Sequence, residues 1–314
     1  MFSQGTSISD RTPTQSLLRI SITIFTGFLL VGPFLGILLS ALVYGNAMES
    51  FLKDQNSIDP SMAMPLIFVQ GMTTFVGLIV FPIIHITRLE NKPLTPLVDK
   101  RMHLNQVLLL VALIGLAFPI AISPLSEFNA QATFPEFLSG FEQWARQQED
   151  LLAKMTKVLT TFDTIGGLLV ALFVIAVLPA IGEELAFRGM IQNELWRGSK
   201  NIHLAIWASA FIFSAIHMQF FGFIPRLLLG ALFGYLYYWS GNLIVPIVAH
   251  FVNNAFGVVM IYLYNIKVIS TDFEEVESAP WSLVIICVIV AGVLLHQVRN
   301  LYLNTPTSAS DQSY

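Results

Sequence analysis

The sequence predicts an all-α fold, a polytopic transmembrane helix bundle, and three features of the chain lead to this prediction. Hydrophobic residues fill 55% of the 314 positions, charged residues fill only 11%, and the mean hydropathy is +0.69. A soluble domain has about 25% charged residues, so this chain has too few charges to cover a surface that faces water. The apolar residues also gather in runs of the length that crosses a bilayer, which is about 20 residues.

About eight candidate spans can be counted along the chain. They cover residues 20–44, 62–86, 105–123, 165–195, 203–218, 224–240, 243–264 and 281–298. The fourth run is long and carries charged residues, and the fifth run is short. The first run is too long for the apolar core of a signal peptide and lacks a clear small-residue cleavage site, so we interpret it as the first span.

Charges in the loops predict how the spans are oriented. Loops that stay in the cytoplasm carry an excess of Lys and Arg. The second and fourth loops are basic and contain Arg88, Lys92, Lys100, Arg101, Arg197 and Lys200. The first and seventh loops are acidic overall and contain Glu49, Lys53, Asp54, Asp59, Asp272, Glu274, Glu275 and Glu277. We therefore predict an integral protein of a bacterial cell membrane whose N- and C-termini both face the cytoplasm.

Residues 134–159, in the third loop, have a different pattern from the spans. Apolar residues recur there at spacings of 3, 4 and 7, with charged residues among them. That spacing is typical of an amphipathic helix. We expect this helix to lie on the non-cytoplasmic membrane surface or to cap the bundle, because its apolar face is one-sided.

Several classes of partner and site are excluded or disfavoured. The formal net charge is −4 and there is no basic tract, so a nucleic acid is not an expected partner. The lipid bilayer is the expected surrounding. One cysteine, Cys287, excludes an intrachain disulfide and a cysteine zinc cluster. Four histidines, His85, His103, His203 and His296, fall at the ends of predicted spans, where we expect solvated, interfacial side chains.

The fourth apolar run contains charged residues that need an explanation. Glu183, Glu184 and Arg188 each cost about 2.5–3.5 kcal/mol inside a membrane helix. Glu184 and Arg188 are four positions apart with the acid first, the favourable order for a helical ion pair. Glu183 lies about 100° around the helix, so its carboxylate can point into the bundle. An ion pair that only locks helices together explains Glu184 and Arg188 better than it explains Glu183.

Two further pairs follow at a spacing of four residues, Phe213 with His217 and His250 with Asn254. A lone histidine at the end of an apolar run is usually an ordinary core or interfacial residue, but a His/Asn pair inside an uncharged span is harder to explain that way. Measured along the helices from the same membrane face, Glu183 and His217 lie at about 20 Å and His250 and Asn254 at about 12–18 Å. Three antiparallel helices thus bring a carboxylate, two imidazoles and an amide to overlapping depths.

The ordered trio of motifs resembles the CPBP family, which includes type II CAAX prenyl endopeptidases and the bacteriocin-processing or immunity proteins of the Abi family. The motifs are Glu183-Glu184-x-x-x-Arg188, Phe213-x-x-x-His217 and His250-x-x-x-Asn254. The resemblance implies an intramembrane peptidase that hydrolyses a membrane-associated protein or peptide. It also implies that Glu183 and His217 activate water, that His250 and Asn254 form an oxyanion hole, and that Glu184, Arg188 and Phe213 support them.

The domain division follows from the extent of this resemblance, which covers about residues 165–264. We assign residues 1–160 to N-terminal spans and the amphipathic helix, without a recognised motif. Residues 161–266 form the expected catalytic core. Residues 267–314 comprise an acidic loop, the last span and a polar tail.

Three questions stay open at this point. No cofactor is favoured, although Glu183, His217 and His250 have the side chains to bind Zn²⁺. The substrate and its prenylation cannot be read from the sequence. A non-catalytic immunity or scaffold protein, and a proton-coupled transporter that uses Glu and His side chains as a relay, are the alternatives to a peptidase.

Overall fold

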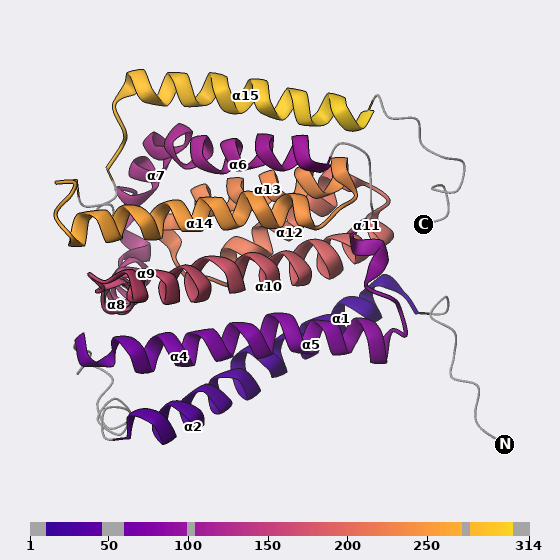
Figure 1. Ribbon diagram of the computed structural model, residues 1–314. Coiled ribbons are helices and arrows are strands. Elements are labelled where there is room, and N and C mark those ends of the chain that lie inside the picture. The colour runs from indigo at the N-terminus through magenta and orange to yellow at the C-terminus, as the bar shows by residue number, and fades with distance from the viewer. Residues whose placement is uncertain (1–10, 46–59, 99–103, 272–276, 304–314) are drawn as a thin grey trace.

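The computed structural model describes residues 11–45, 60–98, 104–271 and 277–303 (Figure 1). Within these ranges the protein is a polytopic helix bundle, and the predicted fold class is confirmed. The first loop, together with Lys100, Arg101, His103 and residues 272–276 of the seventh loop, lies outside the described residues.

Seven helical stretches of the described chain are long and apolar enough to cross a membrane. The first is α1 (Pro13–Phe25), η2 (Thr26–Val31) and α2 (Gly32–Tyr44); the second is α4 (Ala63–Thr74), η4 (Phe75–Val80), α5 (Phe81–Ile84) and η5 (His85–Leu89). The third is α6 (Leu104–Ala121); the fourth is α9 (Ile165–Ala171), η8 (Leu172–Val177), α10 (Leu178–Ala186), η9 (Phe187–Gln192) and α11 (Asn193–Ser199). The remaining three are η10 (Phe220–Gly222) with α13 (Phe223–Ser240), then α14 (Ile244–Asn265), then α15 (Trp281–Leu303).

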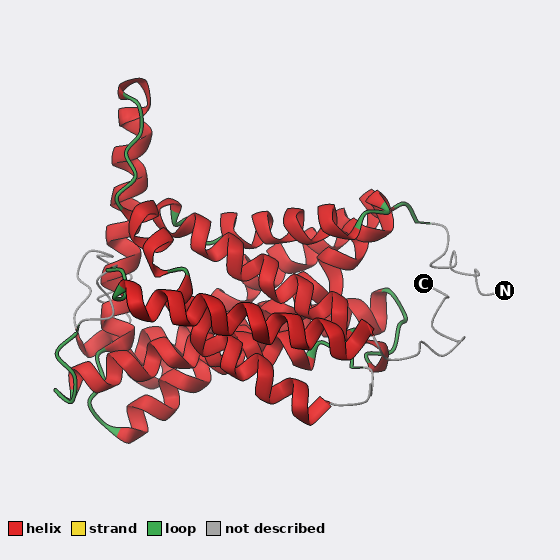
Figure 2. Ribbon diagram, turned by 90° about the horizontal axis from the view of Figure 1, so that it is seen from above, coloured by secondary structure: helices red, strands yellow, loops and turns green. Residues whose placement is uncertain are grey.

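The predicted fifth span is present as a shorter helix. Helix α12 (Ile202–Ala215) has 14 residues, about 21 Å at 1.5 Å per residue, which is less than the hydrocarbon core of a bilayer. The Asn201 side chain accepts the backbone N–H groups of His203 and Leu204 and so starts the helix immediately after α11. The beginning of α1 and the end of α15 lie at the same end of the bundle (Figures 1 and 2), as an even number of crossings requires.

The motif-bearing helices occupy the middle of the bundle. Figure 1 shows α10, α12, α13 and α14 between two outer layers, one with α2 and α4 and the other with α6 and α15.

Glycines permit close approach of neighbouring helices within these layers. A Cβ added to Gly36 would lie 3.0 Å from the Val69 Cα, and one added to Gly230 would lie 3.1 Å from the Ala210 Cα.

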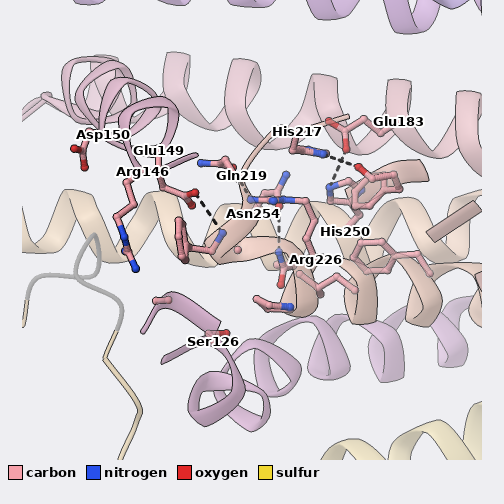
Figure 3. A pocket seen from close by; sticks show the side chains of 18 residues that line it. Ser126, Arg146, Glu149, Asp150, Glu183, His217, Gln219, Arg226, His250 and Asn254 are labelled. Carbon is pink, nitrogen blue, oxygen red and sulfur yellow. Dashed lines mark hydrogen bonds and ion pairs between the residues drawn. The ribbon is translucent and has the colours of Figure 1, made fainter. Parts of the chain in front are cut away.

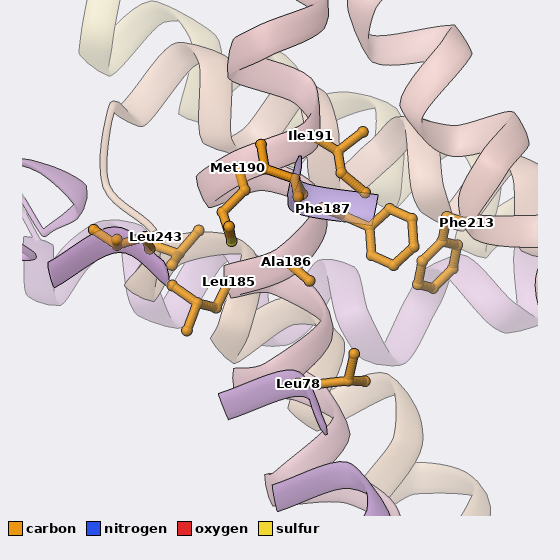
Figure 4. Close-up of a cluster of buried hydrophobic side chains, with 10 residues drawn as sticks. Leu78, Leu185, Ala186, Phe187, Met190, Ile191, Phe213 and Leu243 are labelled. Carbon is orange, nitrogen blue, oxygen red and sulfur yellow. The ribbon is translucent and has the colours of Figure 1, made fainter. Parts of the chain in front are cut away.

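A buried apolar cluster fixes the helix that carries the paired glutamates. Leu185, Phe187 and Met190 follow Glu184 along α10 and η9, and they pack with Phe213 of α12 and Leu243 (Figure 4). The stretch from 165 to 199 is not uniform, because η8 and η9 are π-helical turns on either side of α10. Each π-helical turn changes the direction of the side chains that follow, and such turns often occur at functional sites.

The predicted amphipathic helix is present. It is α8 (Ser139–Thr160), preceded by the short 3-10 turn η7 (Glu136–Leu138). Figure 1 shows α8 end-on, and Figure 2 shows it extending sideways from the bundle, at the end opposite the beginning of α1. Helix α7 (Ser123–Ala130) lies at the same end of the bundle.

One predicted histidine environment is wrong. His85 is 1% exposed, with its Nδ1 atom 2.7 Å from Thr23 Oγ1 and its Nε2 atom 3.7 Å from Glu90 Oε1. The second span ends at Leu89 because the π-helical turn η5 continues it, so His85 faces α1 from inside the helix pair. His203 and His296 are exposed, as expected.

Candidate functional site

A cavity of about 610 Å³ lies between the motif-bearing helices and the helices that cover the α8 end of the bundle. Figure 3 shows its lining side chains. Four of them are the residues that the sequence predicts to be catalytic, and they come from two helices and a turn: Glu183, His217, His250 and Asn254. The structure therefore brings all four into one cavity, while their chemical roles remain predictions.

The second glutamate belongs to a buried ion-pair chain behind this cavity. Glu184 Oε1 is 2.8 Å from Arg188 Nη1 and 2.8 Å from His250 Nδ1, and the three residues are 0%, 1% and 4% exposed. Arg188 also donates through Nη2 to the carbonyl of Gly230 on α13 at 2.7 Å. The predicted Glu184–Arg188 pair is present. The pattern of the sequence did not predict that His250 would complete it, because that contact joins α10 to α14.

Glu183 has the opposite environment. Its side chain is 15% exposed, it lines the cavity, and its Oε2 atom lies 3.9 Å from His250 Nε2. Oε2 has no hydrogen-bond partner among the described residues. A carboxylate oxygen that is buried without a hydrogen-bond partner costs free energy and needs an explanation, such as contact with a bound molecule. Because this oxygen is free and faces the cavity, Glu183 is the candidate in the cavity to accept a proton.

His250 is held between its two carboxylate neighbours and two aromatic rings. Its ring stacks on Phe233, with centroids 4.8 Å apart and planes 17° apart, and meets the Phe213 ring edge-on at 6.2 Å. Nδ1 must carry a proton, because an ionised Glu184 can only accept. The hydrogen bond to Glu184 therefore fixes the orientation of the ring, and Nε2 is the nitrogen on the Glu183 side.

His217 reaches the cavity from the turn after α12. Its Nδ1 atom lies 2.7 Å from the carbonyl oxygen of Phe213, the residue four positions earlier. A carbonyl oxygen only accepts, so Nδ1 carries the proton and the neutral ring keeps its lone pair on Nε2. The following residue, Met218, has a φ of 54°, and the chain reverses there toward η10.

The two asparagines of α14 act together. Asn253 Nδ2 donates to Asn254 Oδ1 at 3.1 Å, and Asn254 Nδ2 donates to the carbonyl oxygen of Ile175 at 3.3 Å. The second N–H bond of the Asn254 amide is left for a molecule in the cavity. Asn253 also lines the cavity, and its hydrogen bond orients the amide of Asn254.

Several cavity residues were not predicted. Arg226 of α13 lines the cavity, donates through Nη2 to Gln219 Oε1 at 2.5 Å, and has no hydrogen-bond partner for Nη1 among the described residues. It is a charged residue inside a predicted span, so the reasoning applied to Glu183 would have identified it. Arg146, Glu149 and Asp150 of α8 also line the cavity. Burial raises the pKa of the Glu149 carboxyl, and the N–H group donated by Phe221 opposes that shift.

The residues named as possible zinc ligands do not fit one ion as they are arranged. Within the described chain, no three His, Cys, Asp or Glu side chains are close enough to hold a metal ion together. The chemistry proposed for this cavity therefore uses the side chains of the protein alone.

Comparison with known proteins gives two kinds of match. Residues 165–256 match the family described as type II CAAX prenyl endopeptidase Rce1-like. The chain is 32% identical over 108 residues to the uncharacterized protein YpbD of Bacillus subtilis (strain 168), across 33% of this chain and 52% of that protein. It is 31% identical over 110 residues to the membrane-embedded CAAX protease MroQ of Staphylococcus aureus (strain USA300), across 33% of this chain and 44% of that protein.

The family match covers the helices that supply the four candidate residues, and it leaves out α7 and α8, which also line the cavity. The matched segment spans about half the length of each curated relative. No solved structure matches the chain. All three motifs lie within the matched residues, so this match supports the resemblance to the CPBP family that the motifs carry.

Proposed function

We propose that the protein is an intramembrane endopeptidase that hydrolyses a peptide bond of a membrane-associated protein or peptide. The observation that supports this most directly is the unpartnered Glu183 carboxylate oxygen, which lies in the cavity 3.9 Å from His250 Nε2. The family match supports a peptidase, and the roles below are inferred from geometry and chemistry.

Glu183 is the general base in this proposal. A water molecule in the cavity gives its proton to the Glu183 carboxylate as its oxygen attacks the carbonyl carbon of the peptide. His217, with its lone pair on Nε2, holds and orients that water. General-base catalysis of this kind contributes about 10²–10⁴ in rate. When the C–N bond breaks, the departing amine takes the proton back from Glu183, and the products are a carboxylic acid and an amine.

His250 and Asn254 stabilise the oxyanion that forms during attack. Asn254 offers the N–H bond that does not point to Ile175, and His250 offers Nε2 when that nitrogen is protonated. Donation through Nε2 requires a cationic ring, because Nδ1 already donates to Glu184. Glu184 and Glu183 lie one on each side of the ring, at 2.8 Å from Nδ1 and 3.9 Å from Nε2.

Glu184 and Arg188 are positioning residues. Their ion pair holds His250 Nδ1 and, through Gly230, ties α10 to α13. They do not line the cavity. The substrate is not assigned by this geometry. The relative named as a CAAX protease makes a CAAX-like protein one class to test, with no assumption about prenylation.

The proposal is tested by comparing membrane proteomes of cells that express the wild type or Glu183→Gln. We expect at least one membrane-associated protein to accumulate uncleaved in Glu183→Gln cells. Glu194→Gln is the matched control, because Glu194 lies on the same long helix but pairs with Arg197 instead of lining the cavity. Cleavage of that protein by purified wild type in lipid, and not by Glu183→Gln, would establish the activity. Identical proteomes in all three strains would contradict it.

A further inference from the structure

The cavity extends in one direction only. Glu183, near the middle of the fourth span, lines its inner part. Its outer part is lined by Ser126 of α7 and by Glu149 and Asp150 of α8. The α13 residues in its lining are Pro225, Arg226, Leu229 and Phe233, and no residue from the rest of α13 toward Ser240 lines it. The cavity, whose lining side chains are drawn in Figure 3, therefore runs from the middle of the bundle to the end where α7 and α8 lie.

The opposite direction is closed by packed side chains and buried hydrogen bonds. Beyond Glu183 along the helix, Arg188 donates to the Gly230 carbonyl and Gln192 donates to the Gly234 carbonyl at 3.2 Å. Both side chains are buried, and the apolar cluster of Leu185, Met190 and Leu243 fills the space beside them. No described residue from 88–98 or 199–204 lines the cavity.

Loop charges distinguish the two ends. At the closed end, Arg88 and Arg197 lie in the last turns of the second and fourth spans, and Lys92 and Lys200 follow just after them. The open end carries Glu127 in α7, Asp163 in the turn after α8, Lys267 just after α14, and Glu277 before α15. Helix α8 carries both acidic and basic residues, so its charges do not indicate which side of the membrane it faces. The excess of Lys and Arg at the closed end is the mark of the cytoplasmic side.

We propose that the cavity opens to the non-cytoplasmic side of the membrane, between α7, α8 and η10, and that the protein cleaves peptide segments which lie on that side. The cleavage in this inference rests on the proposed peptidase function, whereas the direction in which the cavity opens does not depend on that function. A segment in the cytoplasm would have to pass the closed end, where buried ion pairs and apolar side chains leave no route among the described residues.

The chemistry of the opening fits an extended, hydrated peptide. The opening offers charges of both signs, with Arg226 Nη1 unpartnered among described residues and Asp150 exposed. Apolar surface from Phe221 lies beside them, and the N–H group of that residue donates to Glu149 at 3.3 Å. Polar groups at the entrance keep water in reach of the reaction, which hydrolysis requires. The expected substrate class is therefore an external segment of a membrane protein or an exported peptide.

Single-cysteine labelling tests the direction of opening without any substrate. The chain has one cysteine, Cys287, so Cys287→Ser provides a cysteine-free background. Ser126→Cys and Asp150→Cys place a thiol in the open part of the cavity, and Ser199→Cys is the matched control at the closed end. With a membrane-impermeant maleimide, we expect Ser126→Cys and Asp150→Cys to label in intact cells and Ser199→Cys only in inverted vesicles. The reverse pattern, or labelling of Ser126→Cys only in inverted vesicles, overturns the proposal.

The sites of cleavage provide the second measurement. Mass spectrometry of new N-termini in wild-type and Glu183→Gln cells shows on which side of the membrane the cut segments lie. Cuts in non-cytoplasmic segments agree with the proposal. Cuts confined to cytoplasmic segments overturn it while the peptidase function stands. If no new N-termini depend on Glu183, the peptidase function fails, and the labelling experiment still decides the direction of opening.

Discussion

Two buried clusters in this protein use the same residue types and differ in what surrounds them. In the matched segment, His250 contacts Glu184, which pairs with Arg188. In the N-terminal region, His85 lies 3.7 Å from Glu90, which pairs with Arg11 at 2.6 Å. Each cluster contains one histidine, one glutamate and one arginine, and each joins helices that are distant in the sequence.

The difference between the clusters lies on the other side of the histidine. His250 has a second carboxylate, Glu183, and lines the cavity. The Nδ1 atom of His85 instead contacts the hydroxyl of Thr23, and His85 is absent from the cavity lining. A His–Glu–Arg combination alone thus describes a structural tie between helices. The cluster at His250 is a candidate functional site because it also has a second carboxylate, Glu183, with an unpartnered oxygen, and because it lines a cavity.

The largest expected effect separates the two clusters by activity. Glu183→Gln, His217→Ala and His250→Ala should each lower the hydrolysis rate by about 10²–10⁴. The triple variant should cost about as much as one of them, because groups that act as a unit are not additive. His85→Gln is the control, and its rate should match that of the wild type. The measurement is turnover by purified protein in lipid, with the substrate found by proteomics. Persistent activity in Glu183→Gln would refute the base assignment.

The second prediction compares the two ion pairs by stability. Arg188→Ala leaves Glu184 unpaired at 0% exposure, and breaking a buried pair costs about 3–5 kcal/mol. Arg11→Ala removes a partly exposed partner from Glu90, and we expect about 1 kcal/mol or less. Thermal unfolding in detergent measures both. A stable and fully active Arg188→Ala protein would show that the Glu184–Arg188 pair is dispensable.

The third prediction concerns the oxyanion hole and the metal together. Asn254→Ala should lower the rate by about 10²–10³ with the fold intact, as expected when one oxyanion donor is lost. Added Zn²⁺ should not restore the rate. If purified active protein contains stoichiometric zinc and zinc rescues Asn254→Ala, then Asn254 supports a metal ligand, and the metal-free mechanism is wrong.

The sequence predicted the fold class and the convergence of the four candidate residues because both follow from short-range patterns. Apolar runs of span length give the helices, and a spacing of four residues puts His250 and Asn254 on one face. Contacts between helices do not follow from such patterns. The bond from Glu184 to His250 depends on how α10 packs against α14, and the burial of His85 depends on a π-helical turn, which leaves no pattern in the sequence.

The part of the cavity wall formed by α8 is a second case in which contacts between helices could not be predicted from the sequence pattern. The amphipathic pattern over 134–159 predicted a helix at the surface, and the structure has α8 from Ser139 to Thr160. The pattern could not say that Glu149 and Asp150 line the cavity, because that depends on how α8 packs against α4, α14 and η10. Arg226 differs from these residues, since its charge within an apolar run made it detectable.

The variant with the smallest expected effect on the hydrolysis rate tests whether the N-terminal cluster is only structural. Thr23→Val removes the hydroxyl that lies 2.7 Å from His85 Nδ1 while keeping the shape of the side chain. Because His85 is 1% exposed, its nitrogen then loses a partner that water cannot replace, and we expect a loss of about 1–3 kcal/mol in stability. The hydrolysis rate at a temperature well below unfolding should stay at the wild-type value, since His85 and Thr23 do not line the cavity. Thermal unfolding and turnover on the same preparation separate the two outcomes. A drop in rate without a change in unfolding temperature would mean that the N-terminal helices affect the candidate site. The cluster at His85 would then not be purely structural, and the distinction between it and the cluster at His250 would fail.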